Sequence, residues 1–208
     1  EGAFEFKELI EPLASAAVYS LESEILKKPE DISLLQKWVA KKAGTNYKLL
    51  YRGSRDGFRS SDFHKRCDNK GPTIVIIRSS YGKIFGGFTD KSWHSNNQYQ
   101  NTKNSFLFSI DKRGTYPVKV GYENIAIHCY RPAGPVFGIG DLNIADNCNN
   151  NASSYSNFPH GYVCNEFVNN GQSNFLAGAY TFKVEEIEVF QCIVNRLQEK
   201  ADVACSIC

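Results

Sequence analysis

Apolar residues near the N-terminus recur at helical spacing. A stripe with members four positions apart predicts a helix over about residues 13–28. Pro29 interrupts that helix and begins a second one, because proline is tolerated in a first turn and Glu30 and Asp31 complement its positive end. Gly44 ends the second helix. The apolar positions are Leu13, Ala17, Leu21 and Ile25, followed by Ile32, Leu35, Trp38 and Val39.

From Tyr47 onward the pattern changes to short β-type segments. The run TIVIIRS at 73–79 is β-branched and apolar, which predicts a central strand covered on both faces. A turn then leads to IFGGFT at 84–89, its hairpin partner. Short strands with turns between them predict a mainly β (α+β) fold, a two-sheet antiparallel β-sandwich flanked by helices. Further strands are predicted at 47–51, 106–110, 116–120, 125–130 and 141–145, and two within 175–191.

Segment 146–174 consists almost wholly of turn-forming residues and is rich in asparagine. A loop of this length inside a compact domain is either functional or mobile. Segment 146–174 is therefore a candidate functional loop.

The last residues, 192–208, return to helical spacing and predict a C-terminal helix. The end Cys205-Ser206-Ile207-Cys208 has the outline of a prenylation signal. However, Ser206 stands where an aliphatic residue is preferred, and the preceding residues are not polybasic. We therefore favour a short helix packed on the domain.

The composition is that of an ordinary globular protein. The 208 residues carry a net charge of +2, which points to no particular partner. No apolar run approaches the roughly 20 residues of a membrane span, and the acidic N-terminus does not resemble a signal peptide, so no direct membrane insertion is predicted. Seven scattered cysteines predict free thiols in a reducing compartment, and hence a cytoplasmic protein. The absence of methionine indicates a processed chain or a piece of a longer one.

The stretch DFHKRCDNKG at 62–71 concentrates residue types found in catalytic and metal sites. His64 and Cys67 are spaced to share one face of a short helix. Zinc would need two more ligands, and no CxxC or HxxxH motif supplies them. The alternative is a helix end and a turn, with Lys65 and Arg66 at the negative end of the helix. We favour this alternative and predict no metal, cofactor or catalytic residue.

Several motifs occur in an order that resembles the TLDc domain. They are YKLLYRGSRDGFRSSDFHKRCDNKGPTIVIIRS, IFGGFTDKSW, FLFSI, GPVFGIGDLNIAD, SYSNF, FLAGAYTF and EIEVFQ. The resemblance covers most of the chain. It divides the sequence into an N-terminal helical extension (1–22), a TLDc domain (23–191) and a C-terminal helical tail (192–208).

The resemblance implies a central two-sheet β-sandwich flanked by helices. It also implies a link with resistance to oxidative stress and with the V-type proton-pumping ATPase, which several family members bind and regulate. The family has no established reaction, so the favoured function is an interaction module docked on that ATPase at the cytosolic face of acidic organelles. The alternative is a hydrolase or redox enzyme that uses the Asn-rich loop with Glu186 or Glu188.

Four residues that match the family motifs have structural interpretations. Gly57 predicts a turn with positive φ. Gly86 and Gly87 interrupt a strand, which predicts a bulge or a close backbone approach. Trp93 is predicted to be a large core anchor.

Gly138 and Gly140 lie in a run that is often richer in glycine in the family. Pro135 and Ile139 interrupt this run here. The interruption argues against a phosphate-cradling loop, because a lone GxG is a weak signal.

Two acids and a group of cations are candidates for contact with a partner. Glu186 and Glu188 alternate with apolar residues on the last predicted strand, and Glu188 matches a family acid. We favour a solvated or salt-bridged strand face over a partner contact. Residues 37–70 are rich in Lys and Arg, a charge that would steer an acidic protein, whereas no nucleic-acid recognition motif accompanies it. The cationic candidates are Lys41, Lys42, Arg52 and Arg55.

Overall fold

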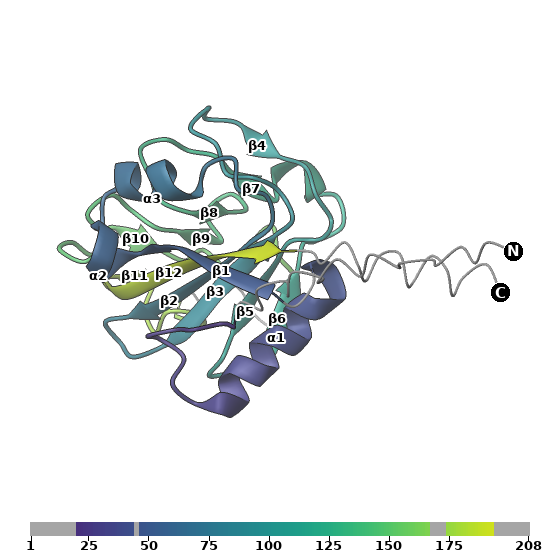
Figure 1. Ribbon diagram of the computed structural model, residues 1–208. Helices are drawn as coiled ribbons and strands as arrows, with labels where there is room; N and C mark the ends of the chain where they lie inside the picture. The colour runs from purple at the N-terminus through teal and green to yellow at the C-terminus, as the bar shows by residue number, and fades with distance from the viewer. Residues whose placement is uncertain (1–19, 44–45, 167–173, 194–208) are drawn as a thin grey trace, which may run out of the picture.

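Two six-stranded antiparallel sheets pack face to face (Figure 1). The computed structural model of the protein describes residues 20–43, 46–166 and 174–193. The face-to-face packing of the two sheets confirms the predicted β-sandwich. In spatial order the first sheet contains β1 (Asn46–Arg52), β12 (Val184–Ile193), β2 (Thr73–Ser79), β3 (Ile84–Thr89), β5 (Phe106–Ser109) and β6 (Gly114–Pro117). The second sheet contains β11 (Thr181–Phe182), β10 (Ser154–Tyr155), β9 (Leu142–Asn143), β8 (Val136–Phe137), β7 (Ile127–His128) and β4 (Tyr99–Gln100).

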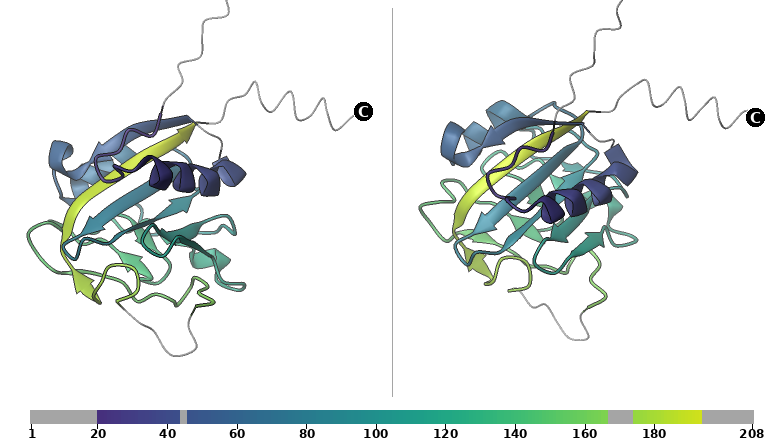
Figure 2. Two further views of the ribbon diagram at one scale, coloured as in Figure 1. Left: turned by 90° about the horizontal axis from the view of Figure 1, so that it is seen from below. Right: turned by 60° about the horizontal axis from the view of Figure 1, so that its bottom comes forward.

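Helices cover the sandwich at its outer face and at one end. The helix α1 lies across the outer face of the first sheet, as Figure 2 shows, where Leu35 and Val39 are buried. Its start at Pro29 confirms the second predicted helix. The helices are α1 (Pro29–Ala43), α2 (Gly53–Asp56), α3 (Ser60–Cys67) and the 3₁₀ helix η1 (Glu123–Ile125).

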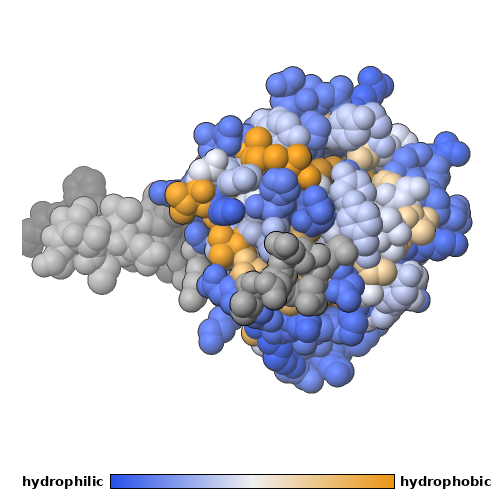
Figure 3. All heavy atoms as spheres, turned by 180° about the vertical axis from the view of Figure 1, so that it is seen from behind, coloured by the Kyte–Doolittle hydropathy of each residue, from blue (hydrophilic) through white to orange (hydrophobic). Residues whose placement is uncertain are grey.

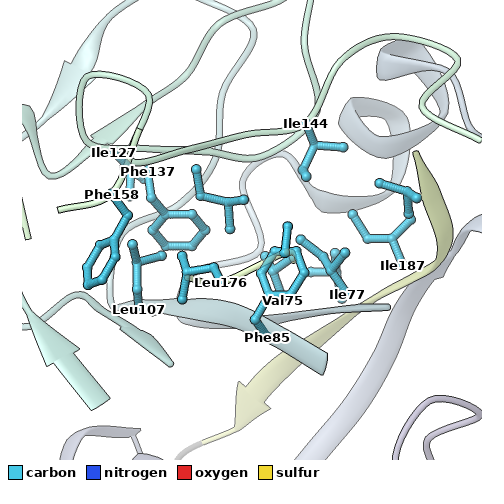
Figure 4. Close-up of a cluster of buried hydrophobic side chains, with 14 of the residues drawn as sticks. Val75, Ile77, Phe85, Leu107, Ile127, Phe137, Ile144, Phe158, Leu176 and Ile187 are labelled. Carbon is cyan, nitrogen blue, oxygen red and sulfur yellow. The ribbon is translucent and has the colours of Figure 1, made fainter. Parts of the chain in front are cut away.

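The main core fills the space between the two sheets. Figure 4 shows side chains of the first sheet pointing toward those of the second, among them Val75 and Phe85 opposite Phe137. A second core lies on the other face of β2, under α1, and includes Ile74 and Ile76. Both faces of β2 are therefore covered, as its continuous apolar run predicts.

The helix predicted over residues 13–28 is wrong in its described part. Residues 20–28 contain no helix and instead form an irregular segment that we call the strap. Within it, Ser23 Oγ accepts hydrogen bonds from the N–H groups of Ile25 and Leu26, a local turn that competes with helix formation. The rest of that prediction lies outside the described residues. The buried side chains of the strap are Leu21, Ile25 and Leu26, which join the core under α1.

The second sheet is built from shorter strands than the sequence predicts. The segment predicted at 125–130 forms a strand only over β7, because η1 occupies its beginning. The Asn-rich segment also contributes β10, which pairs with β9 and β11. At the C-terminal end β12 continues to Ile193, two residues past the predicted end of the domain. The predicted C-terminal helix over 192–208 is wrong at Cys192 and Ile193, which belong to β12, and the rest of it, with the Cys208 end, lies outside the described residues.

Seen from behind, the described surface is mostly hydrophilic, with apolar atoms in small patches (Figure 3). Such patches are normal for a folded domain. In the described part of the chain, no helix combines the length and the apolar character needed to cross a bilayer.

The paired glycines of β3 mark a close approach and not a bulge. The register between β2 and β3 is regular throughout. A Cβ on Gly86 would lie 1.9 Å from the carbonyl oxygen of Val75, and one on Gly87 would lie 2.5 Å from the ring of Phe137. Of the two alternatives predicted from sequence, close backbone approach is therefore the one observed.

We expect Gly86→Ala to lower the free energy of unfolding by about 1–3 kcal/mol, the usual cost of overpacking. The added methyl group meets main-chain atoms of β2, which cannot move without disturbing the pairing of the two strands. Urea unfolding monitored by circular dichroism measures the loss. Gly134→Ala is the matched control, since its Cβ would meet Ile144 at 3.4 Å, an ordinary contact. Equal stability of both variants would contradict the prediction.

Candidate functional site

Glu188 is fully buried and ties the strap to the first sheet. It lies on β12 opposite Arg52 of β1, and Arg52 Nε donates to Glu188 Oε1 at 2.7 Å. The same oxygen accepts the backbone N–H of Glu24 at 2.9 Å, and Ser23 Oγ donates to Oε2 at 2.5 Å. Arg52 also reaches the carbonyl oxygen of Glu22 at 3.3 Å. Both oxygens of Glu188 are therefore engaged inside the domain.

Glu186 is buried as well, with 6 % of its surface exposed. Its Oε1 accepts the backbone N–H of Ser54 at 3.1 Å, at the beginning of α2, and that of Ile187 at 3.0 Å. The predicted salt-bridged strand face thus holds for Glu188, whereas a solvated face holds for neither acid. A partner could touch Glu188 directly only after the strap moved away.

Asp56 connects these residues to α3, although the sequence did not mark it. Its carboxylate accepts the backbone N–H of Arg52 at 3.0 Å and pairs with Arg55 at 2.7 Å and Arg66 at 3.1 Å. Burial acts to raise the pKa of Asp56, but hydrogen bonds from Arg55 and Arg52 and the charges of Arg55 and Arg66 outweigh it, so this pKa is lowered. Asp56 therefore joins Arg52 and Arg55 in one network with Glu188, whereas Glu186 binds the backbone of the adjacent α2.

The two candidate lysines lie elsewhere. Lys42 is exposed at the end of α1, and its Nζ donates to Asn104 Oδ1 at 3.3 Å. The Lys41 side chain is outside the described part of the structure. The sequence grouped these lysines with Arg52 by charge, but the fold separates them.

The DFHKRCDNKG stretch forms the end of α3 and the turn that follows, as predicted. His64 is buried, with Nδ1 2.8 Å from Asp68 Oδ1 and Nε2 3.0 Å from the carbonyl oxygen of Ala133. Burial, helped by the negative charges of Asp68 and Asp56, raises the pKa of the Cys67 thiol well above its usual range. A buried thiol held in the protonated form is a poor nucleophile.

The turn at Gly138 encloses a carboxylate of the chain itself. Asp141 is fully buried and accepts the backbone N–H groups of His160 and Gly161 at 2.6 and 2.9 Å. A Cβ on Gly138, whose φ is +63°, would lie 2.0 Å from Asp141 Oδ2. Burial raises the pKa of Asp141, although the N–H groups oppose this shift. The backbone N–H groups at His160 and Gly161 are therefore already bound to a carboxylate of the chain.

Within the described residues, no group of three or more His, Cys, Asp and Glu side chains is arranged to hold a metal ion. The remaining motif positions are structural. Gly57 has φ +102° in the turn after α2, as predicted. Trp93 is fully buried between the two sheets and α3, which confirms it as a core anchor.

Comparison with protein families decides the classification. The model of the TLDc domain matches residues 20–193, which include all of the described structure. The chain belongs to the TLDc family. The match starts at the strap and ends with β12, so the strap is a part of the TLDc domain.

The TLDc chain is also similar to curated relatives over part of its length. It is 38 % identical over 64 residues to the MTOR-associated protein MEAK7 of Gallus gallus, which is 31 % of this chain and 14 % of that protein. It is 31 % identical over 78 residues to the protein of the same name in Mus musculus, covering 38 % of this chain and 17 % of that protein. The chain thus corresponds to only a small part of these relatives.

Four of the five described cysteines of this TLDc domain are buried free thiols, and Cys164 is half-buried. Burial raises the pKa of Cys129 to about 11 and those of Cys148 and Cys192 to about 12. Together with Cys67, these thiols are neutral and shielded at pH 7.

We therefore expect Cys164 to react with a thiol-specific reagent at pH 7.5 far faster than the four buried thiols. In denaturant, all seven cysteines should react, since the sequence predicts reduced thiols. Mass spectrometry of the alkylated peptides makes the comparison. Rapid labelling of Cys67 in the folded protein, or protected disulfide pairs in denaturant, would contradict this.

The raised thiol pKa values also predict a pH dependence. In the unfolded chain, a thiol loses its proton near pH 9, whereas Cys148 and Cys192 keep theirs in the folded state to about pH 12. The unfolded state is therefore favoured increasingly between these values, and the free energy of unfolding should fall over that range. Urea titrations at pH 8 and pH 10.5 test the sign, and replacing Cys192 by serine should reduce the difference.

Proposed function

We propose that this chain is a TLDc interaction module without catalytic activity that docks on a large protein complex. The partner we propose is the V-type proton-pumping ATPase, which the module would regulate or stabilise from the cytoplasm at the surface of acidic organelles. The observation that carries the proposal is the TLDc match over residues 20–193. A contribution to oxidative-stress resistance is a further part of the same proposal.

The burial and the hydrogen bonds of the candidate catalytic side chains support a non-catalytic role. Glu186 and Glu188, the acids of the enzyme alternative, are buried and bound to groups of the chain. His64 has an oxygen within hydrogen-bond distance of each ring nitrogen. The buried Glu186 and Glu188 lack the access to a substrate that a general base needs, and both ring nitrogens of His64 already face oxygens of the chain.

The names of the relatives support the general class of function. The proteins from Gallus gallus and Mus musculus are named as MTOR-associated, that is, by association with another protein. For this chain we take over only the class, which is attachment to a large protein complex.

Affinity capture from cell extract tests the proposal. The tagged 208-residue chain should enrich subunits of the V-type ATPase over a tag-only control, as measured by quantitative mass spectrometry. Enrichment of a different complex without pump subunits would reject the ATPase as partner. A screen for hydrolase and redox activity, with metal-free and metal-loaded protein, tests the enzyme alternative. Turnover by the wild-type protein that is lost in Glu186→Gln would reject the non-catalytic role.

A further inference from the structure

A cavity of about 550 Å³ opens beside α3, on the side of the second sheet. Its lining includes Ser61 and Lys65 of α3, Ser95, and the pair Arg131 and Pro132 that follows β7. Figure 1 shows α3, β7 and β4 at the same end of the molecule. A volume of this size is within the range of ligand-binding pockets.

Two cations at this cavity are available to an external anion. Lys65 and Arg131 are exposed, and neither forms an ion pair with any residue that the structure describes. The cavity wall also contains one acid, Asp68, whose two oxygens both have partners within the chain. Its Oδ1 lies 2.8 Å from His64 Nδ1, and its Oδ2 accepts a hydrogen bond from Ser95 Oγ at 2.6 Å. The cavity wall therefore carries two cations against one carboxylate, a local excess of positive charge.

An aromatic ladder continues the cavity toward the sheet edge. The rings of Tyr99 and His128 stack at 4.1 Å with an interplanar angle of 19°, and those of His128 and Tyr130 at 5.1 Å and 18°. Tyr99 and Tyr130 are 41 % and 40 % exposed. Tyr130 directly precedes Arg131, and its carbonyl oxygen lies 3.3 Å from Nε2 of His64, a residue of the cavity wall, so the ladder adjoins the cavity at Tyr130.

We propose that this α3–β7 surface, formed by the cavity and the ladder, binds an acidic peptide segment of a partner protein. This inference rests on the proposed function as an interaction module. Carboxylates of the segment pair with Lys65 and Arg131, and a neighbouring aromatic side chain packs on the exposed ring of Tyr130 beside the cavity.

The charge of the surface favours a peptide over a nucleic acid. A typical DNA-binding protein neutralises about 6–10 phosphates, and its affinity depends on that number. The α3–β7 surface offers two unpaired cations, which match two carboxylates of one short segment. The adjacent aromatic rings supply the apolar contact that a peptide side chain needs.

Fluorescence anisotropy tests the surface directly with the 208-residue chain. The probe is a labelled ten-residue peptide of glutamate with one central phenylalanine. The control peptide has glutamine in place of every glutamate. We expect binding of the glutamate peptide only. Lys65→Ala with Arg131→Ala should weaken it at least tenfold, equivalent to 1.4 kcal/mol. Tyr130→Ala should weaken it severalfold, and Lys65→Arg with Arg131→Lys, which keeps both charges, should lose less affinity than the double alanine variant.

The matched charge control removes two other exposed lysines, Lys48 and Lys183. This variant has the same net charge as the Lys65 and Arg131 variant, so it should bind the peptide as the wild type does. An equal loss in both variants would overturn the α3–β7 surface in favour of a general charge effect. Binding of a labelled oligonucleotide or of phosphatidylserine vesicles at this surface, without binding of the glutamate peptide, would overturn it also.

Capture from extract with the same variants separates this inference from the proposed function. Loss of peptide binding together with loss of the captured complex supports both. If the complex is captured but the Lys65 and Arg131 variant still binds the peptide fully, the surface is rejected and the function stands. If peptide binding depends on Lys65 and Arg131 but no complex is captured, the surface stands and the proposed function is rejected.

Discussion

Replacing Arg52 with alanine is expected to lower the free energy of unfolding by about 3–5 kcal/mol, because it leaves the charge of Glu188 buried without its partner. The Glu188 side chain is fully buried, and Arg52 Nε lies 2.7 Å from its carboxylate. The loss also weakens the strap, since Arg52 contacts the carbonyl oxygen of Glu22. Urea unfolding of the 208-residue chain measures the change, and faster hydrogen exchange over residues 20–28 would accompany it.

The charge explanation is separated from lost packing by a double-mutant cycle. Glu188→Gln alone leaves Arg52 able to reach water, because the Arg52 side chain is 18 % exposed. The double variant contains no unpaired buried charge, so it should be more stable than Arg52→Ala alone. If the two single effects simply add in the double variant, the buried-charge explanation is wrong. Ser23→Ala removes three hydrogen bonds, one of them to the charged Glu188, and should cost about 1.5–3 kcal/mol, less than Arg52→Ala.

Replacing Trp93 with alanine should cost about 3–5 kcal/mol, as for other large core side chains. The indole is fully buried and makes edge contacts with Phe63 of α3 and Phe137 of β8, both at 5.5 Å between ring centroids. Its Nε1 donates to Thr73 Oγ1 at 2.9 Å, at the beginning of β2. One side chain thus joins α3 to both sheets. Denaturant unfolding followed by the fluorescence of Trp38, the other tryptophan, measures the loss.

Two milder variants divide this cost between packing and hydrogen bonding. Trp93→Phe keeps an aromatic ring but removes the donor to the buried Thr73 hydroxyl, so about 1–3 kcal/mol should be lost. Thr73→Val removes the acceptor and leaves the indole N–H unsatisfied, at a similar cost. A Trp93→Ala protein within about 1 kcal/mol of the wild type would show that the ring is not an anchor.

The candidate site shows what a sequence can and cannot indicate. The family resemblance drew attention to Glu188 and the local charge to Arg52, and the structure pairs them directly. Nothing local marked Asp56 as the acid that joins Arg52 and Arg55 to Arg66, because Arg66 comes from a different helix. The α3–β7 surface was missed for the same reason, since Lys65 and Arg131 are far apart in the chain.

The strap explains why the first helix prediction failed. Its apolar spacing is genuine, since Leu21 and Ile25 are both buried. However, spacing alone records burial and not backbone conformation. Ser23 caps a turn there, and the buried carboxylate of Glu188 accepts the N–H of Glu24, so tertiary contacts satisfy backbone groups that a helix would otherwise pair.

The sequence by itself determined the elements whose signals are local. The β-branched run of β2, the turn to β3, the proline start of α1 and the helix end at Cys67 depend on propensity and turn chemistry within a few residues. Only the tertiary structure decided which charges are buried together, how residues 20–28 run, and where two-residue strands such as β10 form. Those features depend on contacts between segments that are distant in the sequence. Around the buried carboxylate of Glu188, the need for hydrogen-bond partners outweighs the weak local preference of residues 20–28 for a helix.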